Sequence, residues 1–571
     1  MIRIANCSGF YGDRLSAARE MVEGGPIDVL TGDWLAELTM FILAGNRLKG
    51  RPGYAPTFLR QVEEVLGTCL ERGVRIVSNA GGLDPAGCAQ AVAELAERLG
   101  LRARVAHVTG DDLTGRAGGG PLSAVGGDGA PPLTANAYLG GRPIAAALSA
   151  GADVVVTGRV TDAALVTGPG IWRYGWQPGD LDALAGSVVA GHVIECGCQA
   201  TGGNYAFFDE VPDLAHCGFP IAELHADGSS VVTKHPGTGG RVSVGTVTAQ
   251  LLYEIAGPRY PGPDVVARFD TVRLEQQGED RVRISGVRGE PAPDTLKVAV
   301  THLGGYRNTM TLMVTGLDAA DKARVAEEAI WARVPREAFD EVHVGFDPPL
   351  LRITVFSGDR RVAGRAFSSA VVETGLAGYP GLYGLTPPGD ASPYGVYSPA
   401  YVPADTVRAE VFLDGEPVGT DEPAPGTKAL ERLSTDDPAD PGASAFAEDG
   451  TEVAGGRAWR ELPVVRAPIG RIVGARSGDK GGDANLGVWV TAPERYAWLR
   501  DFLTAERLAD LLPGLTGHRI ERFELPNLLA LNFVVHGLLG RGVAASPRLD
   551  PQAKALGEEL RAQVAEVPEF G

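Results

Sequence analysis

The sequence has few of the features that mark disulfide-rich, membrane or secreted proteins. Only six of its 571 residues are cysteines, which is too few for a disulfide framework. No apolar run reaches the roughly 20 residues that a membrane helix requires, and the longest candidate, 528–539, contains Asn532 and His536. The chain does not open with a basic segment followed by an apolar one, so we predict no secretory signal. We therefore expect a cytoplasmic, reduced protein without a membrane span.

The sequence also has fewer positively charged residues than negatively charged ones. The 52 lysines and arginines are outnumbered by 71 aspartates and glutamates, which leaves a formal net charge of -19. Non-specific nucleic-acid binding needs a basic face, so no nucleic-acid partner is expected. An anionic ligand such as a coenzyme A thioester would need a local basic patch that acts against this overall field. We expect the partner to be a small molecule.

The chain lacks the common cofactor fingerprints. The segment Gly9-Phe-Tyr-Gly12 is only part of a dinucleotide-binding motif, and the lysine of the late glycine-rich segment is followed by glycine instead of Ser or Thr. His192, Glu195, Cys196 and Cys198 include metal-binding side chains, but the set is incomplete as a structural zinc site. We predict no metal, and no cofactor is evident beyond coenzyme A as part of a substrate.

Strands alternate with helices over residues 1–165, which predicts a parallel, Rossmann-like α/β domain. The predicted helices include 57–72 and 85–99. Residues 166–413 read as an α+β continuation of this body. Residues 414–462 have the Asp, Glu, Pro and Gly content of a linker. Residues 463–571 then predict a small C-terminal α+β sandwich domain.

Polar and glycine residues follow five of the predicted strands. Ligands of open α/β sheets bind at the carboxyl ends of strands, so these residues predict a site on one rim. Candidates for a general base are Asp33, Asp84 and Asp111. Candidates for substrate binding are Asn6, Ser8, Gly9, Asn79, Gly81, Gly82, Arg159, Asp162, Asn204 and Lys234. Ordinary loop chemistry remains the alternative, because Gly, Asn and Asp dominate turns in general.

The segment 476–485, Arg-Ser-Gly-Asp-Lys-Gly-Gly-Asp-Ala-Asn, concentrates charge among three glycines. It lies between two apolar, strand-like runs, and we predict a polar loop that holds a ligand. Asp479 and Lys480 are candidate catalytic residues, and Asn485 is a candidate for substrate binding. A purely structural polar hairpin is the alternative. The linker places this segment on a separate domain, so catalytic use requires that domain to dock against the sheet.

A second segment of interest is 380–403, where Tyr383, Tyr394, Tyr397 and Tyr401 interrupt a proline-rich sequence. Long aromatic loops are uncommon unless they cover a site or form an interface. We therefore predict a loop here that covers the site or makes a homo-oligomer contact.

Several of these motifs together resemble the acyclic terpene utilisation (AtuA) family. They are Asn6-Cys-Ser-Gly-Phe-Tyr-Gly-Asp-Arg, Leu30-Thr-Gly-Asp-Trp-Leu-Ala-Glu, Ser78-Asn-Ala-Gly-Gly-Leu-Asp-Pro, Thr157-Gly-Arg-Val-Thr-Asp and the late Ser-Gly-Asp-Lys-Gly-Gly-Asp-Ala-Asn segment. The resemblance covers nearly the whole chain, including an AtuA-like C-terminal module. It implies a role in the bacterial breakdown of citronellol- and geraniol-type compounds through acyl-CoA thioesters.

Three functions follow from this reading. The first is an enzyme that acts on a branched or carboxylated acyl-CoA-type substrate with lyase or hydratase chemistry. Glycine amides and Lys480 would then stabilise an enolate or oxyanion. The second is a non-catalytic subunit that binds an acyl thioester or acts as a scaffold. The third is a metal-assisted hydrolase that uses paired aspartates such as Asp111 and Asp112.

Overall fold

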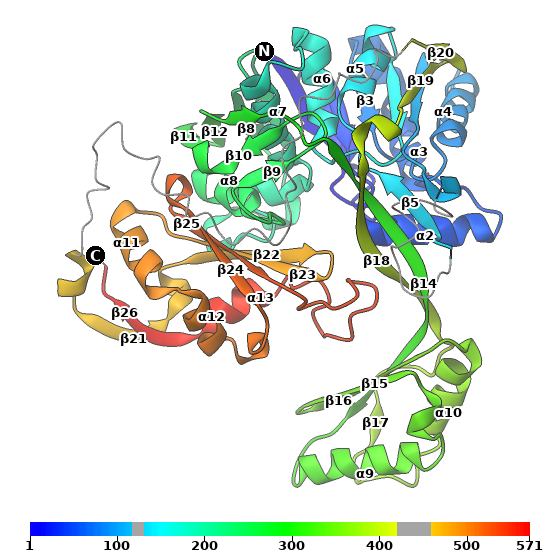
Figure 1. The fold of residues 1–571 in the computed structure, drawn as a ribbon, viewed down its shortest axis with the longest axis vertical. Helices are drawn as coiled ribbons and strands as arrows, with labels where there is room; N and C mark the ends of the chain where they lie inside the picture. Colours follow the sequence, from blue (N-terminus) through cyan, green and yellow to red (C-terminus); the bar gives the residue numbers. More distant parts are fainter. Residues whose placement is uncertain (117–130, 420–457, 571) are drawn as a thin grey trace.

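The computed structural model describes residues 1–116, 131–419 and 458–570. Figure 1 shows three parts: a large α/β body, an arm that extends from it along two long strands, and a C-terminal domain beside the body. Most of the predicted linker 414–462 lies outside the described residues. None of the helices within these ranges combines the length and apolar character needed to cross a bilayer.

An eleven-stranded mixed sheet forms the centre of the body. Its middle strands are parallel and follow the order β1 (Ile2–Asn6), β2 (Val29–Gly32), β3 (Arg75–Ser78), β6 (Val154–Thr157) and β4 (Val105–Thr109). Antiparallel strands extend both edges: β7 (Pro220–Leu224), β8 (Ser230–Lys234), β12 (Arg281–Ser285) and β11 (Arg273–Gly278) beyond β1, and β19 (Glu410–Leu413) and β20 (Glu416–Val418) beyond β4. The predicted parallel sheet is therefore correct for the middle only, because residues after 165 add antiparallel strands to the same sheet.

Helices cover both faces of this sheet, since successive side chains of a strand point to opposite sides. Val155 faces one core, and Val154 and Val156 face the other. The first core packs against α5 (Arg142–Ser149), α6 (Ala164–Tyr174) and α7 (Leu181–Ile194), and the second against α1 (Ala17–Gly24), α3 (Pro56–Arg72) and α4 (Pro85–Arg98). The helices predicted at 57–72 and 85–99 are thus confirmed to within one residue at each end. Also on the body are α2 (Glu37–Leu48), α8 (Val244–Leu251), and a small sheet of β9 (Arg259–Pro261), β10 (Val266–Arg268) and β13 (Arg288–Glu290).

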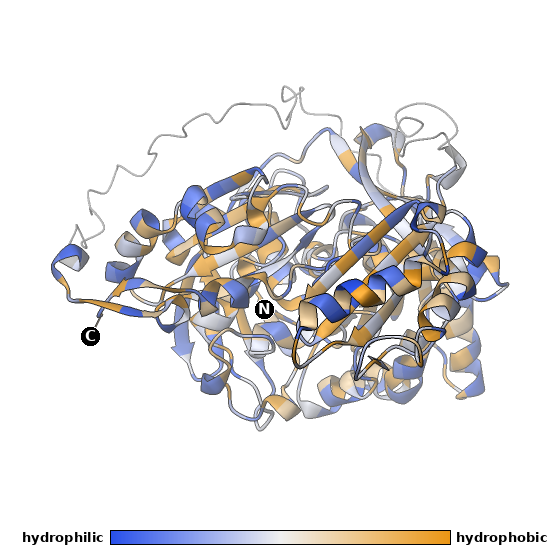
Figure 2. Cartoon of the chain, turned by 90° about the horizontal axis from the view of Figure 1, so that it is seen from below, coloured by the Kyte–Doolittle hydropathy of each residue, from blue (hydrophilic) through white to orange (hydrophobic). Residues whose placement is uncertain are grey.

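The arm grows from two long paired strands, β14 (Thr295–Met313) and β18 (Ser392–Pro403). Near the body β14 also pairs with β5 (Thr134–Ala137), and at its far end it pairs with β16 (Leu350–Ser357). The arm is completed by β15 (Glu341–Asp347), β17 (Tyr383–Gly384), α9 (Ala319–Trp331) and α10 (Phe367–Val372), around a core of its own. Figure 2 views the molecule from the side of the arm and shows both polar and apolar residues on its surface helices, as expected for helices that bury one face. The prediction of a loop over 380–403 is wrong for residues 383–384 and 392–403, because these form β17 and β18.

The C-terminal domain is an antiparallel sheet in the order β22 (Gly474–Lys480), β23 (Asp483–Trp489), β25 (Ala530–Val535) and β24 (Ile520–Leu525). Its helices are α11 (Pro493–Phe502), α12 (Ala505–Leu511) and α13 (Leu556–Ala562), and β21 (Val464–Pro468) pairs with β26 (Val564–Pro568). Ala484, Leu486 and Val488 face the domain's own core. The neighbouring Trp489 belongs to the core of the body instead, so the other face of the sheet packs against the body.

Two glycines allow the sheet of the C-terminal domain to pack closely against the body. A Cβ atom on Gly487 would lie 2.4 Å from Cβ of Leu252, and one on Gly478 would lie 2.5 Å from the ring of Tyr253. Any larger side chain at these positions would push the sheet away from the body. The predicted loop over 476–485 is therefore wrong in form: it is a hairpin of β22 and β23 whose turn contains only Gly481 and Gly482.

Candidate active site

The carboxyl ends of the parallel strands carry a connected polar network, as predicted for this rim. Asp33 follows β2, and its buried carboxylate accepts a hydrogen bond from the Asn79 amide after β3 at 2.6 Å. Asn79 also accepts a hydrogen bond from the backbone N–H of Trp34 at 2.8 Å. Burial and the charge of nearby Asp162 raise the pKa of Asp33 well above its ordinary value. Asp33 thus favours its neutral form.

Asn6 and Ser8 lie at the end of β1, where both side chains are buried. Asn6 Oδ1 accepts a hydrogen bond from the backbone N–H of Ser8 at 2.9 Å, and Asn6 Nδ2 donates to the carbonyl of Glu195 at 3.3 Å. Gly9 follows where the chain passes so close to Cys196 that a Cβ would lie 2.7 Å from its carbonyl carbon. These residues join the end of β1 to the segment that follows α7.

Arg159, which follows β6, connects the residues at this rim to Asp162 and Tyr138. Its buried guanidinium donates to the carbonyl of Leu35 at 2.7 Å and forms an ion pair with Asp162 at 3.2 Å. It also lies 4.4 Å from the ring centre of Tyr138. Burial alone would lower the pKa of Arg159, but the surrounding Tyr138 and acidic groups raise it well above its ordinary value. Arg159 therefore keeps its positive charge, next to the polar network at the strand ends.

Residues at the end of α7 form a second wall. His192 Nδ1 lies 3.2 Å from Glu195 Oε1, and both side chains are buried. Burial, reinforced by the positive charge of Lys480, lowers the pKa of His192 to about 4, so its ring is neutral near pH 7. Burial, Asp162 and Glu254 raise the pKa of Glu195 well above its ordinary value. This wall therefore carries one acidic group, Glu195, that favours its protonated form.

Lys480 brings the C-terminal domain into this cluster. Its ammonium donates a hydrogen bond to the backbone carbonyl of Glu254 at 2.8 Å and lies 5.8 Å from the ring centre of Tyr260. Burial and the positive charge of Lys297 lower the pKa of Lys480. The ammonium thus points into the region between the two domains. Within one chain, the C-terminal domain thus adds Lys480 to the charged cluster of the body.

Asn485 fixes the same junction from the opposite strand. Its Oδ1 accepts a hydrogen bond from the backbone N–H of Glu254 at 2.8 Å, and its amide contacts the side-chain oxygen of Asn532. Asn532 in turn donates to the carbonyl of Ile255 at 3.3 Å. Glu254 has φ of +56°, a left-handed conformation that is costly for a residue other than glycine. The C-terminal domain therefore holds a strained residue by both its N–H and its C=O.

Four further residues belong to the cluster. Glu37, Tyr138 and Lys297 were not selected as site residues from the sequence, whereas Tyr397 lies in the segment predicted to cover the site or make a homo-oligomer contact. The Tyr138 hydroxyl bonds to the Glu37 carboxylate at 3.1 Å. The Lys297 ammonium lies 5.0 Å from the ring centre of Tyr138 and 5.7 Å from that of Tyr397. Glu37 opens α2 four residues after Asp33, and it is the last residue of the motif Leu30-Thr-Gly-Asp-Trp-Leu-Ala-Glu, which was its signal in the sequence.

A hollow adjoins this cluster, between α2, β18 and the C-terminal domain. It is partly open to solvent, and its volume is about 500 Å³ when that open space is included. Glu37, Tyr397, Asp479 and Arg541 are among the polar residues that line it, and Leu38, Phe41, Val543 and Ala544 are among the apolar ones. The walls thus suit a ligand with a polar reactive end and an apolar body.

Two carboxylates of this hollow are shifted in opposite directions. Burial, together with the charges of Glu254 and Glu37, raises the pKa of Asp479 to about 8. Burial acts in the same sense on Glu37, but Lys297 and Arg159 overcome it and hold the pKa of Glu37 below its ordinary value. Near neutral pH Asp479 is mostly protonated and Glu37 is ionised.

Other predicted residues have structural partners. Asp111 accepts hydrogen bonds from Asn136 at 2.8 Å and from the backbone N–H of Arg159 at 2.9 Å, and burial raises its pKa to about 6. Asp84 accepts from the N–H of Gly87 at 2.9 Å and caps α4. Lys234 is buried in an ion pair with Asp280 at 2.9 Å.

The remaining glycines and Asn204 serve the backbone. A Cβ on Gly81 would lie 2.6 Å from the carbonyl oxygen of Thr157, so this glycine allows the ends of β3 and β6 to come together. Gly82 has φ of +54° and Asn204 has φ of +58°, so both take the left-handed conformation of tight turns. Asn204 is exposed, and no contact with the charged cluster is found for it in the described part of the chain.

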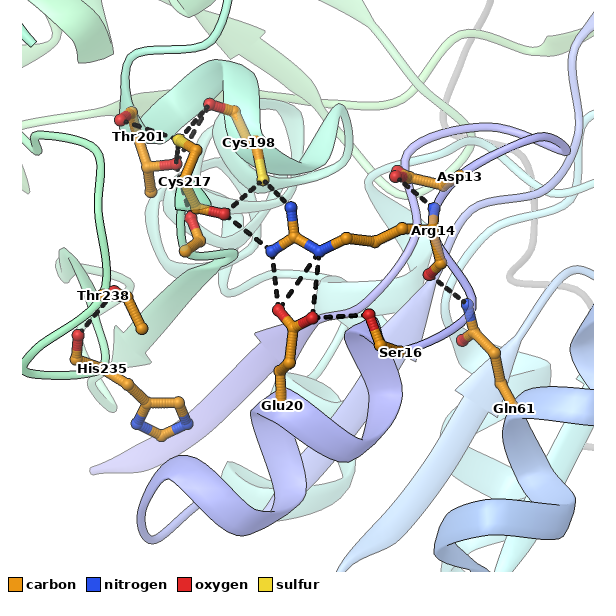
Figure 3. A network of polar contacts seen from close by, with 11 residues as sticks. Asp13, Arg14, Ser16, Glu20, Gln61, Cys198, Thr201, Cys217, His235 and Thr238 are labelled. Carbon is orange, nitrogen blue, oxygen red and sulfur yellow. Dashed lines mark hydrogen bonds and ion pairs between the residues drawn. The ribbon is translucent and has the colours of Figure 1, made fainter. Parts of the chain in front are cut away.

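The segment from His192 to Cys198 divides between two environments. His192 and Glu195 join the cluster, whereas Cys198 faces away from it toward Arg14 and Cys217 (Figure 3). Arg14 lies 3.9 Å from the Cys198 sulfur, donates to the carbonyl of Cys217 at 2.7 Å and pairs with Glu20 at 2.6 Å. Across the described ranges, no three His, Cys, Asp or Glu side chains gather as metal ligands.

The hydrogen bonds of Asn485 to Glu254 and Asn532 predict that loss of the Asn485 side chain destabilises the fold. Asn485→Ala leaves the N–H of Glu254 and the side chain of Asn532 without their partner in a buried setting. Each unsatisfied group costs about 1–3 kcal/mol. We expect the free energy of unfolding to fall by about 2–4 kcal/mol, as measured by urea denaturation. The control Asn46→Ala, at a partly buried position of α2, should change it by less than about 0.5 kcal/mol. Equal losses in the two variants would contradict this role.

The fold and this arrangement define a class of protein: an α/β body with a charged cluster near its strand ends, to which a C-terminal domain adds side chains. The family model described as "Acyclic terpene utilisation family protein AtuA" matches residues 2–413, and the one described as "AtuA ferredoxin-like domain" matches residues 467–566. The chain therefore belongs to the AtuA family, and its C-terminal domain is ferredoxin-like. No curated protein and no solved structure matches the chain.

Proposed function

We propose that the protein is an enzyme of terpenoid or acyl catabolism that acts on a branched or carboxylated acyl-CoA-type substrate. The proposed chemistry is proton transfer next to a carbonyl, as in lyases and hydratases. The family's link with acyclic terpene utilisation supports the catabolic setting. Acyclic terpenes are methyl-branched chains, and the apolar wall of Leu38, Phe41 and Val543 suits such a body.

The pair of Glu37 and Asp479 carries this proposal. Both carboxyl groups line one hollow, and their surroundings move their pKa values apart. Such a pair supplies a base and an acid at the same pH, which is the usual arrangement in enzymes that move protons. Glu37 is therefore the proposed base and Asp479 the proposed acid. Asp33, Asp84 and Asp111, the bases predicted from sequence, are not among the residues that line the hollow.

The proposed step begins when the Glu37 carboxylate removes a proton from the carbon next to the substrate carbonyl. The electron pair of that C–H bond forms the C=C bond of an enolate, whose oxygen becomes negative. Lys480 and Lys297 are not among the residues that line the hollow, but both interact electrostatically with Glu37, which does. We propose them as the source of positive charge for this oxygen, in surroundings of low polarity where charge stabilisation is strong. The enolate then reforms the carbonyl and expels the hydroxyl group on the next carbon, which takes the proton of Asp479 and leaves as water. In the reverse direction Asp479 accepts a proton from the attacking water, and protonated Glu37 returns a proton to carbon.

Solvent exchange tests the proton-transfer step. The wild-type protein in D₂O, without added metal, should incorporate deuterium next to the carbonyl of a branched acyl-CoA, as measured by mass spectrometry. Glu37→Gln should slow this exchange by roughly 100-fold or more, because the base is lost. The control Glu63→Gln, exposed on α3, should exchange at the wild-type rate.

The same assay separates the other two functions. Ligand-induced thermal stabilisation without exchange or turnover would replace the proposal with an acyl-thioester-binding or scaffold role. Thioester hydrolysis that stops on chelation would replace it with a metal-assisted hydrolase. Exchange that persists unchanged in Glu37→Gln would remove Glu37 from its proposed role.

A further inference from the structure

Two arginines on one face of the arm have no acidic partner among the described residues. Arg307 lies on β14 and Arg352 on the adjacent β16, and both are partly buried. Each donates one hydrogen bond to a backbone carbonyl of the C-terminal domain: Arg307 to Ala544 at 2.8 Å, and Arg352 to Pro547 at 2.8 Å. A guanidinium has five N–H donors, so most of their donors remain available.

The strand register places both arginines on the same side of the sheet. Arg307 pairs with Phe356 and Arg352 pairs with Thr311, and the Thr309–Thr354 pair lies between them. Met310 and Ile353, which point to the other side, are buried in the core of the arm. The side with the arginines therefore faces the loop after β25 that holds Ala544 and Pro547.

The two positive charges act on each other. Burial lowers the pKa of Arg307, and burial together with the charge of Arg307 lowers that of Arg352. Two like charges that are partly withdrawn from water are unfavourable unless an anion neutralises them. This arrangement stands out in a chain with a net charge of -19, in which acidic partners are plentiful.

The arginine pair lies beside the hollow of the candidate active site. Arg307 bonds to the carbonyl of Ala544, and Ala544 lines that hollow. Arg541 lines it as well, although its charge is paired with Glu341. Arg548, one residue after Pro547, has a buried Nε with no partner among the described residues. Positive charge thus gathers at one side of the hollow, while Glu37 and Asp479 belong to its acidic part.

We propose that Arg307 and Arg352 form a binding site for a phosphate-type anion that accompanies the ligand of the hollow. Planar guanidinium groups match phosphate oxygens in pairs, which makes arginine the preferred residue for such anions. The source of the anion is the phosphate-bearing end of a coenzyme A thioester, and this part of the inference rests on the proposed function. The acyl end then lies toward Glu37 and Asp479.

Calorimetric titration of the full chain tests this site with three probes: coenzyme A, inorganic diphosphate, and pantetheine, which lacks phosphate. We expect the first two to bind and pantetheine to bind far more weakly. The double variant Arg307→Gln, Arg352→Gln should weaken the binding of both phosphate probes by roughly tenfold or more. Arg365→Gln, an exposed position on the same arm, is the matched control and should bind as the wild type does.

A Lys double variant at the two positions keeps the charge and should retain part of the affinity, and thermal melting shows whether each variant is folded. Unchanged diphosphate binding in the folded Gln variant would overturn the proposal, as would failure of the wild type to bind either phosphate probe. Diphosphate binding without coenzyme A binding would keep the anion site and remove coenzyme A as its source. Diphosphate binding without any solvent exchange would contradict the proposed chemistry and leave the anion site in place.

Discussion

Lys480→Met is expected to lower kcat for the acyl substrate by roughly 100- to 1,000-fold. The Lys480 ammonium is held by the carbonyl of Glu254 at 2.8 Å and lies in a buried setting where its pKa is lowered. Removal of a fixed charge that stabilises an enolate costs most in the transition state, so KM should change much less than kcat. Steady-state kinetics on the full chain measures both quantities.

Two further variants separate catalysis from docking. Lys49→Met, at an exposed position beyond α2, is the matched control and should retain wild-type kinetics. Lys480→Arg keeps a positive charge and should retain more activity than Lys480→Met. A full wild-type kcat in Lys480→Met would contradict the proposal. An activity loss with the same loss of stability as Asn485→Ala would assign Lys480 to docking alone.

The strand-end rim could be predicted because parallel topology makes it a local property. Each residue that follows a parallel strand emerges at the same edge of the sheet, so Asp33, Asn79 and Arg159 come together once the strands are recognised. The interactions among them also follow from residue type, since buried carboxylates need amide or guanidinium partners. This part of the site required no knowledge of the rest of the chain.

The remaining part of the site depends on contacts that are remote in sequence. Lys297 lies within a long strand that carries no motif, and it reaches Glu37 only because β14 pairs with β5 in the body. Glu254 follows α8, and its role is visible only when Asn485 and Lys480 hold its backbone. Local patterns contain no information on such pairings, so these residues could not have been selected in advance.

The hairpin of β22 and β23 shows how one pattern can favour two structures. Three glycines among charges indicated a ligand-binding loop, but one of them, Gly478, lies in β22. Gly478 and Gly487, which lies in β23, allow close contact with Tyr253 and Leu252. Glycine permits a tight turn and also a close approach of two backbones, and sequence alone does not separate these uses. Gly481 and Gly482 act in the predicted way as turn residues, and Gly481 takes the left-handed conformation with φ of +66°.

The prolines of the arm are a second example of a sequence pattern that is compatible with two structures. Pro393, Pro399 and Pro403 suggested an irregular loop, because proline removes a hydrogen-bond donor from a strand. In the structure these residues lie in β18, which pairs with β14 along its length. The aromatic residues that suggested a cover are divided: Tyr397 lines the hollow, whereas Tyr401 is exposed.

Asp479→Asn is expected to lower kcat/KM by roughly 100-fold or more near neutral pH, because the proposed general acid is lost. The pKa of Asp479 is raised to about 8 by burial and by the charges of Glu254 and Glu37. An acid must be protonated to act, so the wild-type rate should fall as pH rises through about 8. The variant should lack this fall, whereas the low-pH limb that reflects Glu37 should remain. A pH profile of kcat/KM measures both limbs.

The raised pKa of Asp479 also predicts that the free energy of unfolding decreases as pH rises. The folded state keeps the proton of Asp479 up to about pH 8, whereas an unfolded aspartate loses it near pH 4. The folded state therefore binds more protons between these values, and its free energy of unfolding falls as pH rises through them. Asp479→Asn should reduce this fall, and Asp510→Asn, exposed on α12, should leave it unchanged. A variant that retains both the high-pH loss of rate and the fall in stability would show that another group titrates in the hollow.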